Sequence, residues 1–297
     1  SHHKQKLGVV FGIEGLFFYL CREKRKKRER ATMPLKAGAK VANLHRIEFV
    51  WIRHGMSCSN FVSRHASNRK AFKDNAKYPY DAPLTNVGKQ QAKYRGRNLP
   101  GPLDLILCSG MVRALQTALG VRQGASEAGD YRTGNATVVP VPCIAEYGGW
   151  SGEKLPTRAI DEIKMFCDGK NVDCSVMERL DPSNEREPNF AYFMSTVMPL
   201  VIKFAERQKI RSPLRIGIVT HQGFLSKNDI VRGRGACNAE CFMEKYRYTV
   251  TPTKVKWYRS ARAPKKTDAC PIVRFDAVDI DACEDPNAIR MAISSRT

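Results

Sequence analysis

The stretch that decides the fold reads IEFVWIRHGMSCSN and covers residues 47–60. Its first six residues are apolar apart from Glu48, which is typical of a buried strand. The strand delivers Arg53 and His54 into a turn that starts with Gly55. An arginine and a histidine in such a place can put a cationic donor and an imidazole nucleophile beside one bound phosphate. The stretch therefore predicts a buried strand that ends in a phosphate-binding site.

Two later segments repeat this arrangement. Residues 214–220 are apolar apart from one arginine and lead directly to His221. Residues 103–108 are apolar apart from one aspartate, and Arg113 follows them at the start of a helical pattern. Side chains that follow the strands of one α/β sheet meet outside the carboxyl ends of those strands. We therefore expect His221 and Arg113 to share one crevice with the Arg-His pair of the first strand.

The order and spacing of these and several other residues resemble the histidine phosphatase superfamily, in the branch that includes the cofactor-dependent phosphoglycerate mutases and related phosphatases. The resemblance runs from about residue 47 to residue 248. It is carried by Arg53-His54-Gly55, Asn60, Leu84-Thr85, Gly88, Gln91, Ala92, Ser109, Arg113, Gln116, Thr117, Glu146 and Val219-Thr220-His221. It implies a phosphoglycerate mutase-like α/β fold, a three-layer sandwich in which a mostly parallel central sheet is flanked by helices.

The resemblance also implies a role for each polar residue of the site. His54 is the nucleophile that becomes phosphorylated, and His221 is a second catalytic histidine that binds the phosphoryl group. The other predicted substrate-binding residues are Arg53, Asn60, Arg113 and Ser57. Arginine suits this task because it is always charged and can bind two oxygens at once. The scheme needs no metal and no cofactor.

A leaving alcohol needs a proton, and the attacking water must later lose one, so a shielded carboxyl group can serve both steps. Glu146 is the predicted group. It follows a mostly apolar stretch, residues 137–145, that we expect to form a strand, and it precedes a Tyr-Gly-Gly-Trp turn that we expect to wall the pocket. The family usually spaces the glycine and tryptophan further from the glutamate, so the chain departs from the family pattern here.

A rival phosphatase signature is also present, because Cys58 and Arg64 are separated by five residues, as in cysteine-dependent tyrosine phosphatases. That chemistry needs a loop of converging backbone amides and a thiol of lowered pKa. The five residues between them include no glycine, and arginine is frequent throughout this chain. We therefore expect His54, and not Cys58, to be the nucleophile.

The chain has 297 residues, of which 42% are hydrophobic, enough for one sizeable α/β domain with extensions. We place the catalytic domain at residues 44–250, with one insert near 61–80 that covers the pocket mouth and another near 154–188 that selects the substrate. Residues 1–43 comprise a tag remnant, a short apolar segment and a basic linker. Residues 251–297 form a basic C-terminal extension.

The formal net charge of +21 favours anionic partners. Residues 7–30 combine a short apolar segment with a basic run. The apolar segment is too short to span a bilayer, but the stretch as a whole is compatible with a weak membrane-surface contact, a nuclear signal or a solvated tail. No readout element for nucleic acid accompanies the charge, so no specific nucleic-acid partner is expected. Ten irregularly spaced cysteines indicate a reducing, cytoplasmic compartment in which most of them are buried. The oligomeric state is left open.

Hydrolysis is favoured over mutase chemistry. A family mutase holds its substrate with basic residues downstream of the acid, including an arginine pair, whereas this chain offers only Lys154, Arg158 and Lys164 there. The expected function is a metal-independent phosphomonoesterase that acts on a phosphorylated small molecule or a phosphoprotein. Phosphoglycerate mutase-type transfer is the first alternative, and a non-catalytic scaffold with the same fold is the second.

Overall fold

A computed structural model describes residues 45–77, 80–147, 160–167, 169–180, 188–210, 213–231, 235–250, 255–260, 265–266, 277–283 and 285–294. All of them belong to one compact unit, Asn43–Thr297. The predicted apolar and basic segments before residue 44, and the Gly-Gly-Trp part of the predicted pocket wall, lie outside the described residues. No helix within the described ranges is long and apolar enough to cross a membrane.

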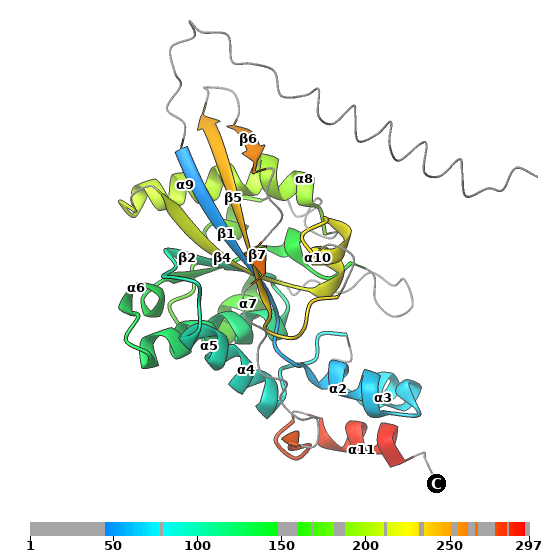
Figure 1. The fold of residues 1–297 in the computed structure, drawn as a ribbon. Coiled ribbons are helices and arrows are strands. Elements are labelled where there is room, and N and C mark those ends of the chain that lie inside the picture. The colour runs from blue at the N-terminus through cyan, green and yellow to red at the C-terminus, as the bar shows by residue number, and fades with distance from the viewer. Residues whose placement is uncertain are drawn as a thin grey trace, which may run out of the picture. The chain divides into compact units, whose positions relative to one another are not determined.

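The central sheet has the strand order β3-β2-β4-β1-β5-β6, and β7 also pairs with β5 (Figure 1). The strands are β1 (His45–Arg53), β2 (Leu105–Cys108), β3 (Thr137–Pro140), β4 (Leu214–Thr220), β5 (Cys241–Val250), β6 (Val255–Arg259) and β7 (Lys265–Lys266). Strands β3, β2, β4 and β1 are parallel neighbours, and among the described strands only β5 runs against the others. This is the mostly parallel sheet that the sequence predicts.

The helices are α2 (Cys58–His65), α3 (Arg69–Asn75), α4 (Asn86–Arg97), α5 (Val112–Glu127), α6 (Tyr131–Gly134), α7 (Ile160–Cys167), α8 (Phe190–Tyr192), α9 (Met198–Arg207), α10 (Gln222–Lys227) and α11 (Pro286–Ser294). Short 3-10 turns cover Pro142–Ile144 and Met177–Arg179. Apolar residues at helical spacing predict a helix over 190–208, and a π turn, Phe193–Val197, joins α8 to α9 so that the helical segment runs unbroken to Arg207.

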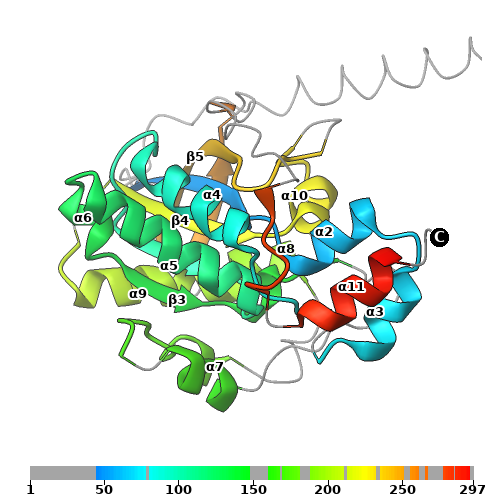
Figure 2. The same ribbon diagram turned by 90° about the horizontal axis from the view of Figure 1, so that it is seen from below.

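Helices pack on both faces of the sheet. Successive side chains of a strand point to opposite faces, and β1 accordingly gives Phe49 and Trp51 to one core cluster and Val50 and Ile52 to another. The first cluster also contains residues of α9 and α10, and the second contains residues of α5, beside which α4 lies (Figure 2). The sheet thus lies between two helical layers, which confirms the predicted three-layer sandwich.

The register of the sheet brings strand ends together. In the pair of β1 with β4, Arg53 lies opposite Thr220, so the residues that follow the two strands, His54 and His221, become neighbours. The backbone N–H of His54 donates to the carbonyl of Thr220 at 2.9 Å. This single pairing positions two of the predicted catalytic residues.

The C-terminal segment returns to the helices that follow the Arg-His motif. Helix α11 packs against α2 and α3 (Figure 2). The shared cluster is apolar and includes Phe61, Val62, Phe72, Ile289 and Ala292. Strand β6, which also follows residue 250, extends the central sheet beyond β5.

Several predicted boundaries are wrong by a few residues. The strand expected over 137–145 stops at Pro140, because proline donates no backbone hydrogen bond and Pro142 starts a 3-10 turn. The residues after His221 predict a helix over 224–231, but α10 ends at Lys227, just before Asp229 adopts a φ of 57°. The sequence also predicts a late strand over 238–248, which begins only at Cys241. A further strand that the sequence predicts over 272–280 lies mostly outside the described residues, and 277–280 are not in a strand.

Candidate active site

The carboxyl ends of four parallel strands meet at one edge of the sheet, and the predicted catalytic groups lie there. Arg53 ends β1 and His54 follows it, while His221 follows β4. Arg113 is in the first turn of α5, after β2, and Glu146 follows the turn after β3. The rings of His54 and His221 have centroids 5.0 Å apart, and the nearest polar atoms of His54, Glu146 and His221 all lie within 4.8 Å of one another.

His54 is held in one orientation. Its side chain is 1% exposed, and Nδ1 lies 2.6 Å from the carbonyl oxygen of Gly55. A carbonyl can only accept, so Nδ1 carries the proton and Nε2 keeps its lone pair. Burial, reinforced by the charges of Arg113 and Arg53, holds the pKa of His54 well below its usual value. The ring is therefore neutral at pH 7, the state in which Nε2 is nucleophilic.

His221 is fully buried, and within the described residues neither ring nitrogen has a hydrogen-bond partner. Burial, with the charges of Arg113, His54 and Arg53, holds the pKa of His221 well below its usual value. Its Nδ1 lies 3.8 Å from Oε2 of Glu146, too far for a hydrogen bond. A buried polar ring that lacks partners costs free energy, and an oxygen of a bound anion would supply one.

Two arginines give the site its positive charge. Arg113 is 5% exposed and donates from Nη1 to the carbonyl of Tyr80 at 2.9 Å. Arg53 donates from Nη1 to the carbonyl of Ala236 at 2.5 Å, whereas its buried Nε has no partner within the described chain. Burial lowers the pKa of Arg53 to about 10, so the guanidinium keeps its proton at neutral pH. The two guanidinium groups therefore favour an anion.

Glu146 is anchored by the start of α10. Its Oε1 accepts the backbone N–H of Gly223 at 2.6 Å. Burial raises the pKa of Glu146 above its ordinary value, although Arg113, the Gly223 N–H and Arg53 act in the opposite direction. The side chain keeps 19% of its surface exposed, so a proton can reach it from outside. The next residue, Tyr147, stacks on Phe224 at 5.8 Å between centroids.

The remaining residues of the resemblance tie the turn after His54 to α4 and α5. The N–H of Gly55 donates to Thr117 Oγ1 at 3.0 Å, and that hydroxyl donates to the carbonyl of Arg113 at 2.7 Å. The N–H of Met56 donates to Gln91 Oε1 at 2.9 Å. Thr85 caps α4 as predicted, because its side chain accepts from the N–H of Gly88. These contacts position His54 and Arg113 relative to each other.

Ser57 and Asn60 form a reciprocal cap at the start of α2. The hydroxyl of Ser57 accepts the N–H of Asn60 at 3.2 Å and shares a hydrogen bond with Ser59. Ser57 is 0% exposed, and these bonds account for its hydroxyl. The amide oxygen of Asn60 accepts the N–H of Ser57 at 3.4 Å, whereas its NH₂ group donates to no residue of the described ranges. The NH₂ group of Asn60 is thus available as a hydrogen-bond donor. Ser57 caps and stabilises α2, the helix that contains Asn60.

The His54, His221 and Glu146 atoms could also be considered as metal ligands, since two imidazoles and a carboxylate are a known zinc-binding set. The charges of Arg53 and Arg113 in the same pocket oppose a dication, because each guanidinium repels it in a site of low dielectric. The group of residues fits a phosphoryl anion better than a metal ion.

Cys58 does not lie in the arrangement that a tyrosine phosphatase needs. It is 3% exposed, and its Sγ is 3.0 Å from Sγ of Cys283, in the segment before α11. The hydrogen bond with Cys283 and burial both raise the pKa of Cys58. A nucleophilic cysteine needs the opposite shift. Seven of the eight described cysteines are buried, as predicted, and Cys237 is exposed.

Asp81 is a site residue that the sequence analysis missed. It is 4% exposed, and its Oδ1 accepts the N–H of Val112 at 2.9 Å while lying 3.8 Å from Nη1 of Arg113. The carboxylate therefore holds both the first turn of α5 and the guanidinium of Arg113. In the sequence, Asp81 could have been recognised by its position three residues before Leu84-Thr85.

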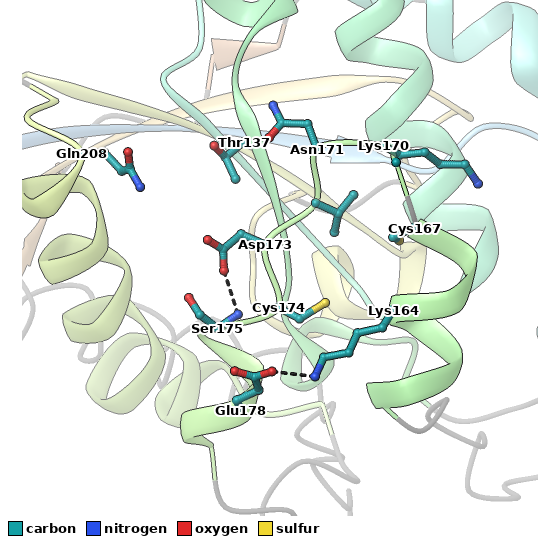
Figure 3. A pocket seen from close by; sticks show the side chains of 12 residues that line it. Thr137, Lys164, Cys167, Lys170, Asn171, Asp173, Cys174, Ser175, Glu178 and Gln208 are labelled. Atoms are coloured by element: carbon teal, nitrogen blue, oxygen red, sulfur yellow. Dashed lines mark hydrogen bonds and ion pairs between the residues drawn. The ribbon is translucent and has the colours of Figure 1, made fainter.

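Lys164, one of the basic residues that could hold a mutase substrate, does not lie in the site around His54. Lys164, on α7, forms an ion pair of 2.6 Å with Glu178 and lines a groove of about 680 Å³ together with Asp173 and Cys174 (Figure 3). This groove is lined by none of the site residues Arg53, His54, Arg113, Glu146 and His221. Lys154 and Arg158 lie outside the described residues.

Comparisons with known proteins show what this chain is similar to. The chain resembles solved structures of an ecdysone phosphate phosphatase from Bombyx mori in complex with tungstate (TM-score 0.43, 16% identity, 77% of this chain and 97% of that one). It also resembles a mycobacterial glucosyl-3-phosphoglycerate phosphatase (TM-score 0.39, 17% identity, 75% and 100%) and a putative alpha-ribazole-5'-P phosphatase from Escherichia coli (TM-score 0.37, 19% identity, 76% and 99%). No curated protein sequence matches the chain. The model of the histidine phosphatase superfamily (branch 1) matches residues 52–226, more than half of the chain, and the chain therefore belongs to that superfamily.

Proposed function

We propose that this protein is a metal-independent phosphomonoesterase that works through a phosphohistidine on His54. The observation that carries the proposal is the orientation of the ring. Its Nδ1 donates to the Gly55 carbonyl, so the neutral Nε2 is available beside His221 and the guanidinium groups of Arg53 and Arg113. A phosphate monoester carries nearly two negative charges, and these must be neutralised before a nucleophile can approach the phosphorus.

In the first step, Nε2 of His54 forms a bond to phosphorus while the bond from phosphorus to the ester oxygen breaks. Glu146 gives its proton to the departing alcohol oxygen. Arg53, Arg113 and His221 bind the three phosphoryl oxygens, and the free NH₂ of Asn60 adds a neutral donor. The transition state of phosphoryl transfer is loose, so positioning and charge supply most of the catalysis.

In the second step, water attacks the phosphorus of phosphohistidine, and Glu146 takes the proton that the water loses. The N–P bond breaks, inorganic phosphate leaves, and His54 and Glu146 return to their starting states. The raised pKa of Glu146 supports this double role, because the group must be protonated in the first step and able to accept a proton in the second.

Hydrolysis is preferred to the mutase alternative because of what surrounds the site. Of the three basic residues considered for holding a mutase substrate, Lys154, Arg158 and Lys164, the one that the structure describes, Lys164, is paired with Glu178. The scaffold alternative is disfavoured because each expected chemical position is filled by a residue suited to it.

Phosphate release from a panel of phosphomonoesters, measured in EDTA with no added metal, tests the proposal. We expect turnover by the wild type and at least a thousand-fold loss in His54→Ala. His45→Ala is the matched control, because His45 stacks on Tyr248 at the amino end of the same strand and should leave the rate unchanged. Turnover that needs a metal, or that survives in His54→Ala, would overturn the proposal. Transfer of phosphate between glycerate positions, without net release, would favour the mutase.

A further inference from the structure

A short turn before β5 holds the end of β1. The N–H of Arg53 donates to the carbonyl of Glu240 at 3.0 Å, and the N–H of Ala239 donates back to the carbonyl of Arg53 at 3.0 Å. Ala239 adopts a φ of 55°, and its carbonyl accepts from Nε of the fully buried Arg95 at 2.7 Å. The turn is thus fixed from two sides and lies against the backbone of the proposed nucleophile.

Asn238, in this turn, contacts two parts of the site at once. Its side-chain NH₂ donates to the backbone carbonyl of His54 at 3.0 Å and to Oδ1 of Asn60 at 3.2 Å. Asn238 is 8% exposed; its bond to His54 is buried, and its bond to Asn60 is partly buried. It lies 184 residues from His54 and 178 from Asn60 in the chain.

The hydrogen bond from Asn238 to Oδ1 of Asn60 determines which end of the Asn60 amide faces the site. Oδ1 of Asn60 accepts from Asn238 and from the N–H of Ser57. If the amide turned over, its NH₂ would face these two N–H groups, and three donors would meet without an acceptor. The contacts therefore leave the NH₂ of Asn60 as the end available for a phosphoryl oxygen.

We propose that Asn238 is a positioning residue for phosphoryl transfer: it joins the His54 backbone to Asn60 and keeps the Asn60 amide turned so that it donates to the substrate. Without Asn238, the amide can turn its oxygen toward the phosphoryl group, where it repels instead of binding. The inference rests on the proposed function of the site, and it adds a residue that acts through the Asn60 amide and is anchored by the backbone of His54.

A double-mutant cycle of Asn238→Ala and Asn60→Ala tests this role, with p-nitrophenyl phosphate as substrate and orthovanadate as a phosphoryl mimic. A hydrogen bond to a charged group is worth about ten-fold, so each single variant should lower kcat/KM and weaken orthovanadate inhibition by roughly that factor. The double variant should be about as impaired as either single one, because the Asn60 amide is the group that Asn238 orients and the bond to the His54 carbonyl only anchors Asn238 itself. Losses that multiply to about a hundred-fold, or an Asn238→Ala enzyme with wild-type kinetics, overturn the proposal.

A matched control separates this role from general stability. Asn98→Ala removes a comparable side-chain hydrogen bond, from Nδ2 to the carbonyl of Tyr94 at 2.9 Å, at the exposed end of α4. Asn98→Ala should leave both kcat/KM and the inhibition constant of orthovanadate unchanged. If Asn238→Ala does not give a cooperative thermal transition, Asn238→Leu takes its place in the cycle, since it keeps roughly the size of the side chain, loses the donor and adds no charge.

The inference and the proposed function fail in different ways. If the wild type releases no phosphate from any monoester, the proposed hydrolysis is wrong, and the same cycle is then read from the affinity for orthovanadate alone. Non-additive losses of affinity would still support the role of Asn238. Absence of orthovanadate binding by the wild type would overturn both.

Discussion

The backbone N–H of Gly223 and the carboxylate of Glu146 meet at 2.6 Å, and a Cβ on Gly223 would lie 2.3 Å from Oε1 of Glu146. Real Cβ atoms do not approach an oxygen so closely, so the residue at 223 must be glycine if Glu146 is to stay where it is. The Oγ1 of Thr220 supports the same region by donating to the carbonyl of Ile144 at 2.5 Å. The glycine that follows His221 thus positions the proposed acid.

Gly223→Ala should displace the Glu146 carboxylate while leaving His54 in place. We expect kcat to fall at least ten-fold for an alkyl phosphate, whose alcohol leaves poorly without a proton, and only a few-fold for p-nitrophenyl phosphate. The ratio of the two rates measures the effect. Equal losses with both substrates would contradict this role for the Gly223 contact.

Glu146→Gln should abolish proton donation with little change in shape. The expected loss is about 10² to 10⁴ in kcat for an alkyl phosphate. In the wild type, the step that needs protonated Glu146 should slow as pH rises through the raised pKa of this group, and the variant should lack that limb of the pH–rate profile. An unchanged profile in the variant would show that another group donates the proton.

The buried histidines predict a loss of stability in acid. His54 and His221 have folded-state pKa values well below the ordinary 6.5, so the unfolded chain binds more protons than the folded protein below that pH. Their contribution is fully present above about pH 6.5 and is lost as pH falls toward the folded pKa, at up to about 1.4 kcal/mol per pH unit for each histidine. The free energy of unfolding from urea titrations between pH 7.5 and 5 measures this slope. His221→Asn should reduce the slope by up to about 1.4 kcal/mol per pH unit, the contribution of one bound proton. The same slope in that variant would contradict the lowered pKa of His221 in the folded protein.

Cys58→Ser should keep turnover, because the thiol faces Cys283 and has a raised pKa. Some loss of stability is expected, about 1 kcal/mol, since a buried thiol is replaced by a hydroxyl that must find a partner. Steady-state kinetics and a thermal melt check the two parts separately. Loss of turnover with an unchanged melting temperature would revive the cysteine mechanism.

Local sequence was enough to predict the strands that end in Arg53 and His221, because each is a continuous apolar run that ends at a polar residue. The site could be anticipated from the same residues, since parallel strands share the edge at which they end. Apolarity alone predicts too long a strand for β3, because Pro140 and Pro142 end the strand within an apolar stretch.

The contacts that complete the site could not be predicted in this way. Asp81 and Asn238 are single polar residues in irregular segments, and their partners Arg113 and His54 are brought to them only by the folded sheet. The docking of α11 on α2 and α3 likewise depends on a long-range apolar cluster that no local pattern reveals.

The most direct test of the central claim is to trap the phosphoenzyme. The wild type is mixed with p-nitrophenyl phosphate, quenched in alkali within milliseconds, digested and examined by mass spectrometry under conditions that preserve phosphohistidine. We predict one phosphoryl group on His54 and none in His54→Ala. A phosphoryl group on Cys58, or continued turnover by His54→Ala, would contradict the account.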